Sequence, residues 1–379
     1  MNEIVRTLQQ NIVERLEPGK VLLLFGARRV GKTMLIKSIG KSFNGKSLLL
    51  NGEDMTTHAM LADKSIANYQ LLFHGIDLLI IDEAQGIAEI GAKLKLIVDE
   101  IPTIHIIASG SSSFDLLNLT GEPLVGRSKT FYLFPFSQQE YMQVESGIEA
   151  VQNLESKLIY GTYPQLLHLN PSEKQEYLQD LVNGYLLKDI LAIDGLRNSN
   201  KMNELLRLIA LQSGNLVSFD ELGRQLGLSK NTVEKYLDLL SKVFIIYRLG
   251  AFSNNQRKEI SKSAKWYFYD NGIRNALISN FSPLSIRSDV GQLWESFVLS
   301  ERLKRKYFNI LPIKYYFWRT YDQQEIDLVE VQNQDINAFE CKWSAKKAKV
   351  PIAFQRAYPT AQFSEINKEN FLRYLTDIH

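Results

Sequence analysis

The sequence has 379 residues, and at about 100–200 residues per domain this length predicts two to four domains. With 45% hydrophobic and 23% charged residues, the composition excludes a disordered or collagen-like chain. The formal net charge of +2 excludes a strongly basic or acidic protein, so any nucleic-acid-binding surface must be a local feature.

Two further features bear on the cellular compartment. Cys341 is the single cysteine, which excludes an intramolecular disulfide. No apolar run approaches the ~18–20 residues that a membrane span needs, and residues 1–20 alternate in charge without an apolar core. We therefore expect a cytoplasmic protein without a targeting segment or a membrane anchor.

A glycine-rich loop follows the first strand-like run, residues 21–25, and precedes a helical pattern over residues 34–41. Gly26 and Gly31 let the backbone curl, so that its N–H groups face phosphates. Lys32 supplies a cation for the β/γ oxygens, and the Thr33 hydroxyl can complete a Mg²⁺ shell. The sequence thus predicts that ATP and Mg²⁺ bind at Gly26, Ala27, Arg28, Arg29, Val30, Gly31, Lys32, Thr33 and Met34.

A second apolar run, residues 77–81, ends in Asp82 and Glu83. A parallel strand would deliver both carboxylates to the sheet edge that carries the glycine loop. We expect Asp82 to hold Mg²⁺ and Glu83 to orient and polarise the attacking water, which predicts ATP hydrolysis. The alternative is that the loop is only a turn and that the two acids begin a helix.

Further strand-like runs at residues 46–51 and 103–110 indicate a doubly wound parallel sheet. Ser109 and Ser111 are candidates for sensing the γ-phosphate, or they belong to the cap of a helix that starts near Phe114. Arg127 is a candidate arginine finger, acting in cis or from a neighbouring subunit of a homo-oligomer, or else a surface arginine.

The middle of the chain is predicted to be helical over residues 137–193 and then to form a winged helix-turn-helix. Residues 224–265 hold nine basic and three acidic residues, which indicates a face that binds DNA phosphates. The alternative is a module that contacts subunits or other domains. The candidate nucleic-acid contacts lie on the recognition helix and in the wing loop: Lys230, Asn231, Lys235, Arg257 and Lys258.

The C-terminal third has a helical pattern over residues 290–303, followed by strand-like runs at 313–318, 325–331 and 338–343. A hairpin between the last two runs would bring Asp327 close to Glu340 and Lys342, and Glu295 on the helix can add a fourth group. Two carboxylates that bind a divalent cation beside a lysine suit metal-dependent phosphodiester cleavage. The alternative is that these charges simply face solvent.

Several motifs in this order resemble the prokaryotic AAA-type ATPases that carry a C-terminal domain of unknown function. The motifs are Gly26 to Thr33, Asp82 to Gln85, Gly110 to Ser112, Gly126-Arg127, Gly161 to Pro164, Lys265 to Asp270, Glu325 to Asp327 and Glu340 to Lys342. The resemblance implies an ATPase core, a winged helix and a nuclease-like domain of the PD-(D/E)xK type. It also implies that Glu295, Asp327, Glu340 and Lys342 carry the nuclease pattern, with Ile326-Asp327 where that motif has Pro-Asp.

We therefore predict a P-loop ATPase domain at residues 1–136 and a helical lid or connector at 137–200. A winged-helix domain at 201–275 and a restriction-endonuclease-like α/β domain at 276–379 follow. The expected function is ATP binding and hydrolysis in a DNA-associated protein. The alternative is an ATP-driven switch whose terminal domains bind partners or nucleic acid without cleavage.

Overall fold

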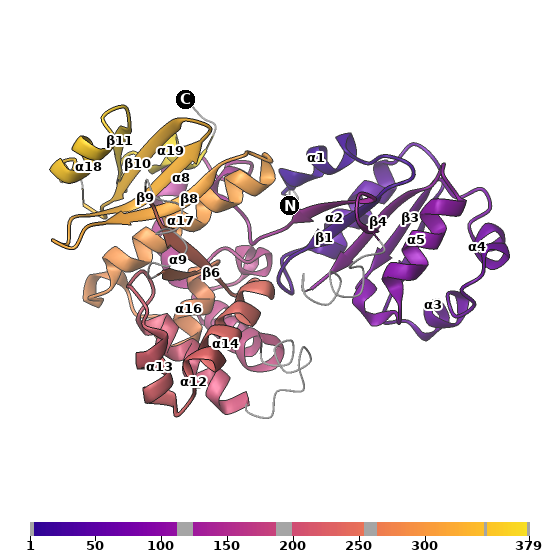
Figure 1. The fold of residues 1–379 in the computed structure, drawn as a ribbon, viewed down its shortest axis with the longest axis horizontal. Helices are drawn as coiled ribbons and strands as arrows, with labels where there is room; N and C mark the ends of the chain where they lie inside the picture. Colours follow the sequence, from indigo (N-terminus) through magenta and orange to yellow (C-terminus); the bar gives the residue numbers. More distant parts are fainter. Residues whose placement is uncertain (1–3, 112–123, 187–198, 254–263, 345–346, 377–379) are drawn as a thin grey trace. The chain divides into compact units, whose positions relative to one another are not determined.

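The computed structural model describes residues 4–111, 124–186, 199–253, 264–344 and 347–376 (Figure 1). The chain divides into two compact units. The N-terminal unit comprises Val5–Pro135 together with Lys242–Phe244. The C-terminal unit comprises Met1–Ile4, Phe136–Ser241 and Ile245–His379.

The N-terminal unit is built on a five-stranded parallel sheet in the order β2-β3-β4-β1-β5. All residues of its β1 and β3 strands are buried, as expected for parallel strands that are covered on both faces. The strands are β1 (Val21–Phe25), β2 (Ser47–Asn51), β3 (Leu78–Asp82), β4 (His105–Gly110) and β5 (Ser128–Tyr132). This finding confirms the predicted parallel α/β architecture.

The helices of this unit connect the parallel strands. The helix α2 packs against β2, β3 and β4, and α1 packs against α2. Their bounds are α1 (Leu8–Glu14), α2 (Lys32–Ser42), α3 (Met55–Met60), α4 (Ile66–Leu72) and α5 (Ile90–Glu100), with a 3₁₀ turn at Ala84–Gly86. In the register of the sheet, Phe25 lies beside Gly110 and Ile81 beside Ala108. The carboxyl ends of β1, β3 and β4 therefore share one edge.

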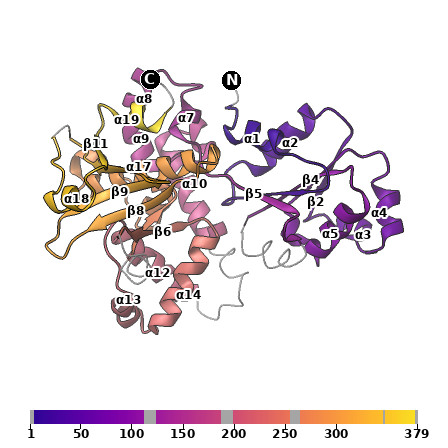
Figure 2. The same ribbon diagram turned by 45° about the horizontal axis from the view of Figure 1, so that its top comes forward.

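The C-terminal unit contains a six-stranded mixed sheet in the order β11-β10-β9-β8-β6-β7 (Figure 2). Its strands are β6 (Ile246–Ala251), β7 (Lys265–Phe268), β8 (Lys314–Arg319), β9 (Glu325–Gln332), β10 (Asp335–Cys341) and β11 (Gln362–Ile366). The two strands expected to form a wing, β6 and β7, pair with each other, and β6 also pairs in parallel with β8. The domain boundaries predicted at 200/201 and 275/276 consequently fall inside one compact unit.

The long helix α17 (Val290–Phe308) packs against β7, β10, α9 and α16. Its Trp294 is fully buried and donates its indole N–H to the Ile366 carbonyl at 3.1 Å. The other helices described in this unit are α7 (Gln138–Tyr141), α8 (Gly147–Gln152), α9 (Leu154–Tyr160), α10 (Pro171–Asp180), α12 (Ser199–Leu211), α13 (Phe219–Leu226), α14 (Lys230–Lys242), α16 (Asn271–Leu277), α18 (Ile352–Ala357) and α19 (Phe371–Leu375).

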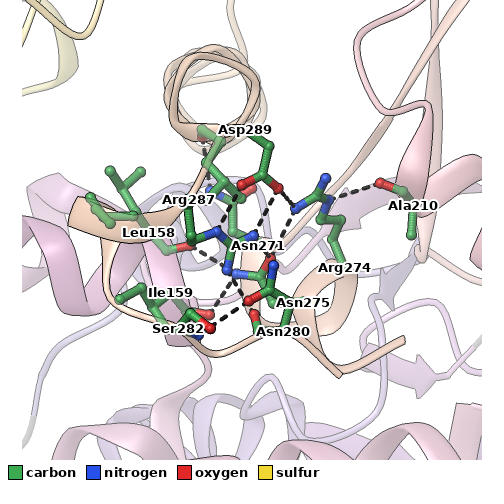
Figure 3. A network of polar contacts seen from close by, with 12 residues as sticks. Leu158, Ile159, Ala210, Asn271, Arg274, Asn275, Asn280, Ser282, Arg287 and Asp289 are labelled. Atoms are coloured by element: carbon green, nitrogen blue, oxygen red, sulfur yellow. Dashed lines mark hydrogen bonds and ion pairs between the residues drawn. The ribbon is translucent and has the colours of Figure 1, made fainter. Parts of the chain in front are cut away.

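A buried polar network joins α9, α12, α16 and the start of α17 (Figure 3). Both Arg274 and Arg287 form ion pairs with Asp289, and Arg287 also donates to the Asn275 side-chain oxygen at 2.9 Å. The Asn275 amide donates in turn to the Ile159 carbonyl at 2.7 Å. Burial alone would raise the pKa of Asp289, but the hydrogen bonds from both arginines hold this pKa well below its usual range. The network therefore holds α16 against α9, α12 and the start of α17.

The Gly161 to Pro164 motif also has a structural role. Gly161 has φ +76°, and a Cβ atom there would clash with the buried carboxylate of Asp270. That carboxylate accepts hydrogen bonds from the backbone N–H of Thr162 at 2.7 Å and of Gly272 at 2.8 Å. The Gly161 to Pro164 motif and the Lys265 to Asp270 motif, which are far apart in the sequence, thus connect the end of α9 to the start of α16.

Candidate nucleotide-binding site

The glycine loop leaves the end of β1 and turns directly into α2. A Cβ atom at Gly26 would clash with the Leu133 carbonyl, and Gly31 has φ +99°, so both positions require glycine. Leu133 donates its N–H to the Phe25 carbonyl at 2.7 Å, which ties the root of the loop to the segment after β5. Val30 is fully buried, whereas Met34 is 60% exposed.

Lys32 is held by the loop itself. Lys32 is 4% exposed. Its ammonium donates to the carbonyls of Gly26 at 2.9 Å and Ala27 at 3.1 Å. The cation therefore lies within the curl of the backbone, where it donates to two neutral carbonyls.

Thr33 and Asp82 bring their oxygen atoms together at the carboxyl edge of the sheet. The Thr33 hydroxyl donates to Asp82 Oδ2 at 2.7 Å. Asp82 Oδ1 accepts from the fully buried Ser109 hydroxyl on β4. Because Mg²⁺ prefers oxygen ligands such as hydroxyl and carboxylate groups, this pair fits the predicted Mg²⁺ position.

Glu83 is oriented by a residue that the sequence did not single out for the site. Glu83 has φ +49°, an unusual backbone conformation for a non-glycine residue. Gln85 donates its side-chain amide to Glu83 Oε2 at 2.6 Å and to the Ser111 hydroxyl at 3.4 Å. The Asp82 to Gln85 motif includes Gln85, but the hydrogen bond from Gln85 to Glu83 depends on the 3₁₀ turn at Ala84–Gly86. Of the two candidate serines, Ser109 contacts Asp82 and Ser111 contacts Gln85.

Arg127 lies at the amino-terminal end of the parallel strands, opposite to the end that carries the glycine loop. Val21, the first residue of β1, donates its N–H to the Arg127 carbonyl at 2.8 Å. The five residues of β1 separate this edge from the glycine loop, which at about 3.3 Å per residue is roughly 16 Å. The Arg127 side chain forms an ion pair with Asp99 on α5 at 2.7 Å. Its proposed role as a finger in cis does not fit this placement; a role from a neighbouring subunit stays a prediction.

The predicted nuclease residues come together in the C-terminal unit around a further cation. The Lys265 ammonium forms ion pairs with Glu295 at 3.2 Å and with Glu325. Tyr267 donates its hydroxyl to Glu295. Burial alone would lower the pKa of Lys265, but Glu295, Glu325 and Asp327 together raise it above its ordinary value. The sequence interpretation missed Lys265, because it lies on β7, outside the expected nuclease domain.

The remaining groups of this acidic cluster have partners other than Lys265. Asp327 accepts the Cys341 backbone N–H at 2.8 Å, and Lys342 lies 2.6 Å from Glu340. Burial and the nearby Asp327 raise the pKa of Glu295 to about 7, and burial raises the pKa of Asp327 and Glu340 as well. Within the described ranges, no three His, Cys, Asp or Glu side chains are grouped so that they could hold a metal ion. Of the carboxylates predicted to bind a metal, Glu295 thus has the Lys265 ammonium as a partner.

The predicted recognition helix is α14, which begins at Lys230. Lys230, Asn231 and Lys235 are all exposed on it. Lys230 lies 3.5 Å from Asp220 on α13, and both side chains are more than half exposed. A Cβ atom at Gly223 would be 2.7 Å from the Leu228 carbonyl, so the turn between α13 and α14 is tight. Arg257 and Lys258, predicted for the wing loop, lie outside the described residues.

Residues 18–142 match the family model described as AAA domain. Together with the loop geometry, the match supports an AAA-type P-loop ATPase domain at this end of the chain. Residues 151–284 and 290–375 match two models described as domains of unknown function, DUF8612 and DUF4143.

Two relatives are similar to this chain over most of its length. An uncharacterized protein of Mycobacterium tuberculosis is 27% identical over 83% of this chain and 68% of its own length. An uncharacterized protein of Methanocaldococcus jannaschii is 22% identical over 96% of this chain and 84% of its own length. These relatives show how far the similarity extends beyond the AAA domain.

Among solved structures, the Thermotoga maritima RuvB Holliday junction branch migration motor is similar at a TM-score of 0.32. It is 18% identical, and the similarity covers 64% of this chain and 86% of that one. A Pif1 helicase from Candida albicans is similar at a TM-score of 0.29 and 14% identity, over 48% of each chain.

In the described part of this chain, no helix has the length and apolar character needed to cross a membrane.

Proposed function

We propose that the N-terminal unit binds ATP with Mg²⁺ and hydrolyses it. The observation that carries this proposal is the hydrogen bond of 2.7 Å between the Thr33 hydroxyl and Asp82, next to the glycine loop that encloses Lys32. A turn with a merely structural role has no need to align a hydroxyl, a carboxylate and a buried ammonium at one sheet edge. The AAA match over residues 18–142 supports the same proposal.

The residues of this site have separate tasks in the proposed reaction. Lys32 exchanges its carbonyl partners for phosphate oxygens, and the backbone N–H groups of the loop and of the first turn of α2 bind the remaining phosphate charge. Thr33 and Asp82 would hold Mg²⁺, which would neutralise charge on the phosphates. Glu83 orients the attacking water and accepts its proton, while Gln85 holds the carboxylate in position.

Phosphate release by the full chain, with and without Mg²⁺, tests this proposal. We expect Lys32→Ala to abolish nucleotide binding. Glu83→Gln should keep nucleotide binding but stop hydrolysis, because the amide cannot accept the proton of water. A Glu83→Gln variant that still turns over ATP would overturn the role assigned to Glu83.

We further propose that the C-terminal unit binds DNA and that the nucleotide regulates this binding without cleavage of the strand. Three exposed residues at the start of α14 support phosphate contact: Lys230, Asn231 and Lys235. The ion pair between Lys265 and Glu295 supports the absence of cleavage, because one carboxylate of the predicted metal site already has a buried ammonium as its partner.

DNA binding measured over a series of salt concentrations tests this second proposal. Replacing both Lys230 and Lys235 with alanine should lower the salt slope by about two, since each lost phosphate contact removes about one unit. Lys201→Ala is the matched control, because Lys201 is a partly exposed lysine on α12 that pairs with Glu204. Metal-dependent DNA cleavage that is lost in Lys342→Ala would show instead that the acidic cluster is a nuclease site.

A further inference from the structure

Arg6 lies just before α1 and is 7% exposed. Its guanidinium donates to the Val30 carbonyl of the glycine loop at 2.9 Å and to the Phe134 carbonyl at 2.5 Å. A Cβ atom at Gly31 would be 3.8 Å from the same guanidinium, so Arg6 is packed against the loop immediately before Lys32. Arg6 therefore holds the outer side of the nucleotide loop.

Phe134 is the second partner of Arg6 and is itself part of an aromatic group. The ring of Phe244 lies 6.3 Å from the Phe134 ring and 5.6 Å from the Tyr132 ring. Phe244 has φ +61°, a conformation that a bulky residue keeps only when its surroundings hold it. The aromatic packing on Tyr132 and Phe134 supplies that constraint.

These residues also lie where the chain passes between its two units. The crossings fall between Ile4 and Val5, between Pro135 and Phe136, and on either side of Lys242–Phe244. Arg6, Phe134 and Phe244 are thus each within two residues of a crossing. Phe244 also connects the end of α14 to the start of β6.

We propose that Arg6 is a positioning residue for the nucleotide loop, and that Arg6, Phe134 and Phe244 form a junction that transmits nucleotide occupancy to α14 and β6. A phosphate bound on the loop pulls on the Val30 peptide, Arg6 transfers this shift to Phe134, and the strained Phe244 responds. The transmission part rests on the proposed ATP site, whereas the positioning part does not.

The positioning role is tested by hydrogen–deuterium exchange of the full chain without nucleotide. We expect Arg6→Ala to raise exchange over residues 26–35, and Arg6→Lys, which keeps the charge, to raise it less. Arg15→Ala is the control, because the Arg15 side chain bonds to Asn11 within α1 and not to the loop. Equal exchange in Arg6→Ala and Arg15→Ala would overturn the positioning role, even if the chain binds no ATP.

The same variants then test ATP affinity and transmission. Arg6→Ala should weaken ATP binding about tenfold, the amount expected for losing a charged hydrogen bond to the loop. In the wild type, ATP should change exchange over residues 242–251, and Phe244→Ala should remove that change while ATP still binds. Phe281→Ala is the aromatic control, since the Phe281 ring stacks on Tyr160 in the C-terminal unit.

Each failure has a distinct meaning. If ATP binds to the wild type but leaves residues 242–251 unchanged, the transmission role is wrong and the proposed ATP function stands. If ATP does not bind to the wild type, the proposed function and the transmission role both fail. Circular dichroism melting of every variant shows whether a loss of binding follows from unfolding.

Discussion

The nucleotide site and the acidic cluster of the C-terminal unit both combine carboxylates with a buried lysine, yet the lysines have different partners. Lys32 is bound by carbonyl oxygens of its own loop, whereas Lys265 is bound by the carboxylates of Glu295 and Glu325. Carbonyl oxygens are neutral partners, so a phosphate at Lys32 would add a negative charge that they do not supply. A lysine between carboxylates has its charge cancelled, and it stabilises the fold around it.

The carboxylates of the two sites also differ in whether one of their partners carries a positive charge. Asp82 accepts from two hydroxyl groups, Thr33 and Ser109, which Mg²⁺ can share or replace. Glu295 accepts from Tyr267 and Lys265, and a metal there would have to displace an ammonium. The identity of the counter-charge, more than the number of acidic groups, therefore distinguishes a ligand site from a structural one.

The largest expected effect is on stability, at Lys265. Lys265→Met leaves Glu295 and Glu325 without their buried counter-charge, so we expect the free energy of unfolding to fall by about 3–5 kcal/mol in urea denaturation. Lys342→Met is the control, because the Lys342 side chain is 47% exposed, and it should cost less than about 1 kcal/mol. Equal losses would contradict the stabilising role assigned to Lys265. Stabilisation of Lys265→Met by Mn²⁺, without an effect on the wild type, would show that the ammonium occupies a cation position.

The next largest effect is on catalysis, at Gln85. Gln85→Leu removes the donor that holds Glu83, so we expect the rate of ATP hydrolysis to fall about 10- to 100-fold with ATP affinity retained. Single-turnover phosphate release and fluorescent-nucleotide binding measure the two quantities. Gln10→Leu is the control, because Gln10 bonds to Glu14 on the surface of α1. A Gln85→Leu variant with unchanged turnover would separate Gln85 from the reaction.

A smaller effect is expected from pH on the acidic cluster. Because the pKa of Glu295 is raised from 4.5 to about 7, the folded state binds this proton more tightly than the unfolded state does. Its contribution to stability is therefore complete below pH 4.5 and is lost as pH rises through about 7. The slope is at most about 1.4 kcal/mol per pH unit for one proton. Urea denaturation between pH 5 and 8 should show a flatter dependence in Glu295→Gln than in the wild type, and parallel curves would contradict the assignment.

The smallest effect is expected at Arg127. Its ion pair with Asp99 is partly exposed, so Arg127→Ala should cost less than about 1 kcal/mol of stability. Hydrolysis by an isolated subunit should be unchanged, because Arg127 lies at the sheet edge opposite the glycine loop. ATPase rates over a range of protein concentration measure this. A loss of activity that appears only at concentrations where subunits associate would instead support a finger acting in trans.

The local features of the chain were determined by the sequence itself. The strand–loop–helix from Val21 to Ser42, the strand ending at Asp82 and the long helix from Val290 each follow from hydrophobic period and glycine position over neighbouring residues. Backbone conformation and apolar patterning act over a few residues, so these elements could be read in chain order.

The tertiary structure decided which of those elements lie side by side. Sheet order brings Ser109 to Asp82, β6 joins β8 across a predicted domain boundary, and β7 carries Lys265 into the acidic cluster. Parallel register also places Arg127 at the edge away from the nucleotide loop. Strand order and register depend on packing between residues that are distant in the sequence, and no local pattern encodes them. The sequence therefore determined which groups are present at the nucleotide site, and the fold alone decided that Lys265 pairs with Glu295 and Glu325 in the acidic cluster.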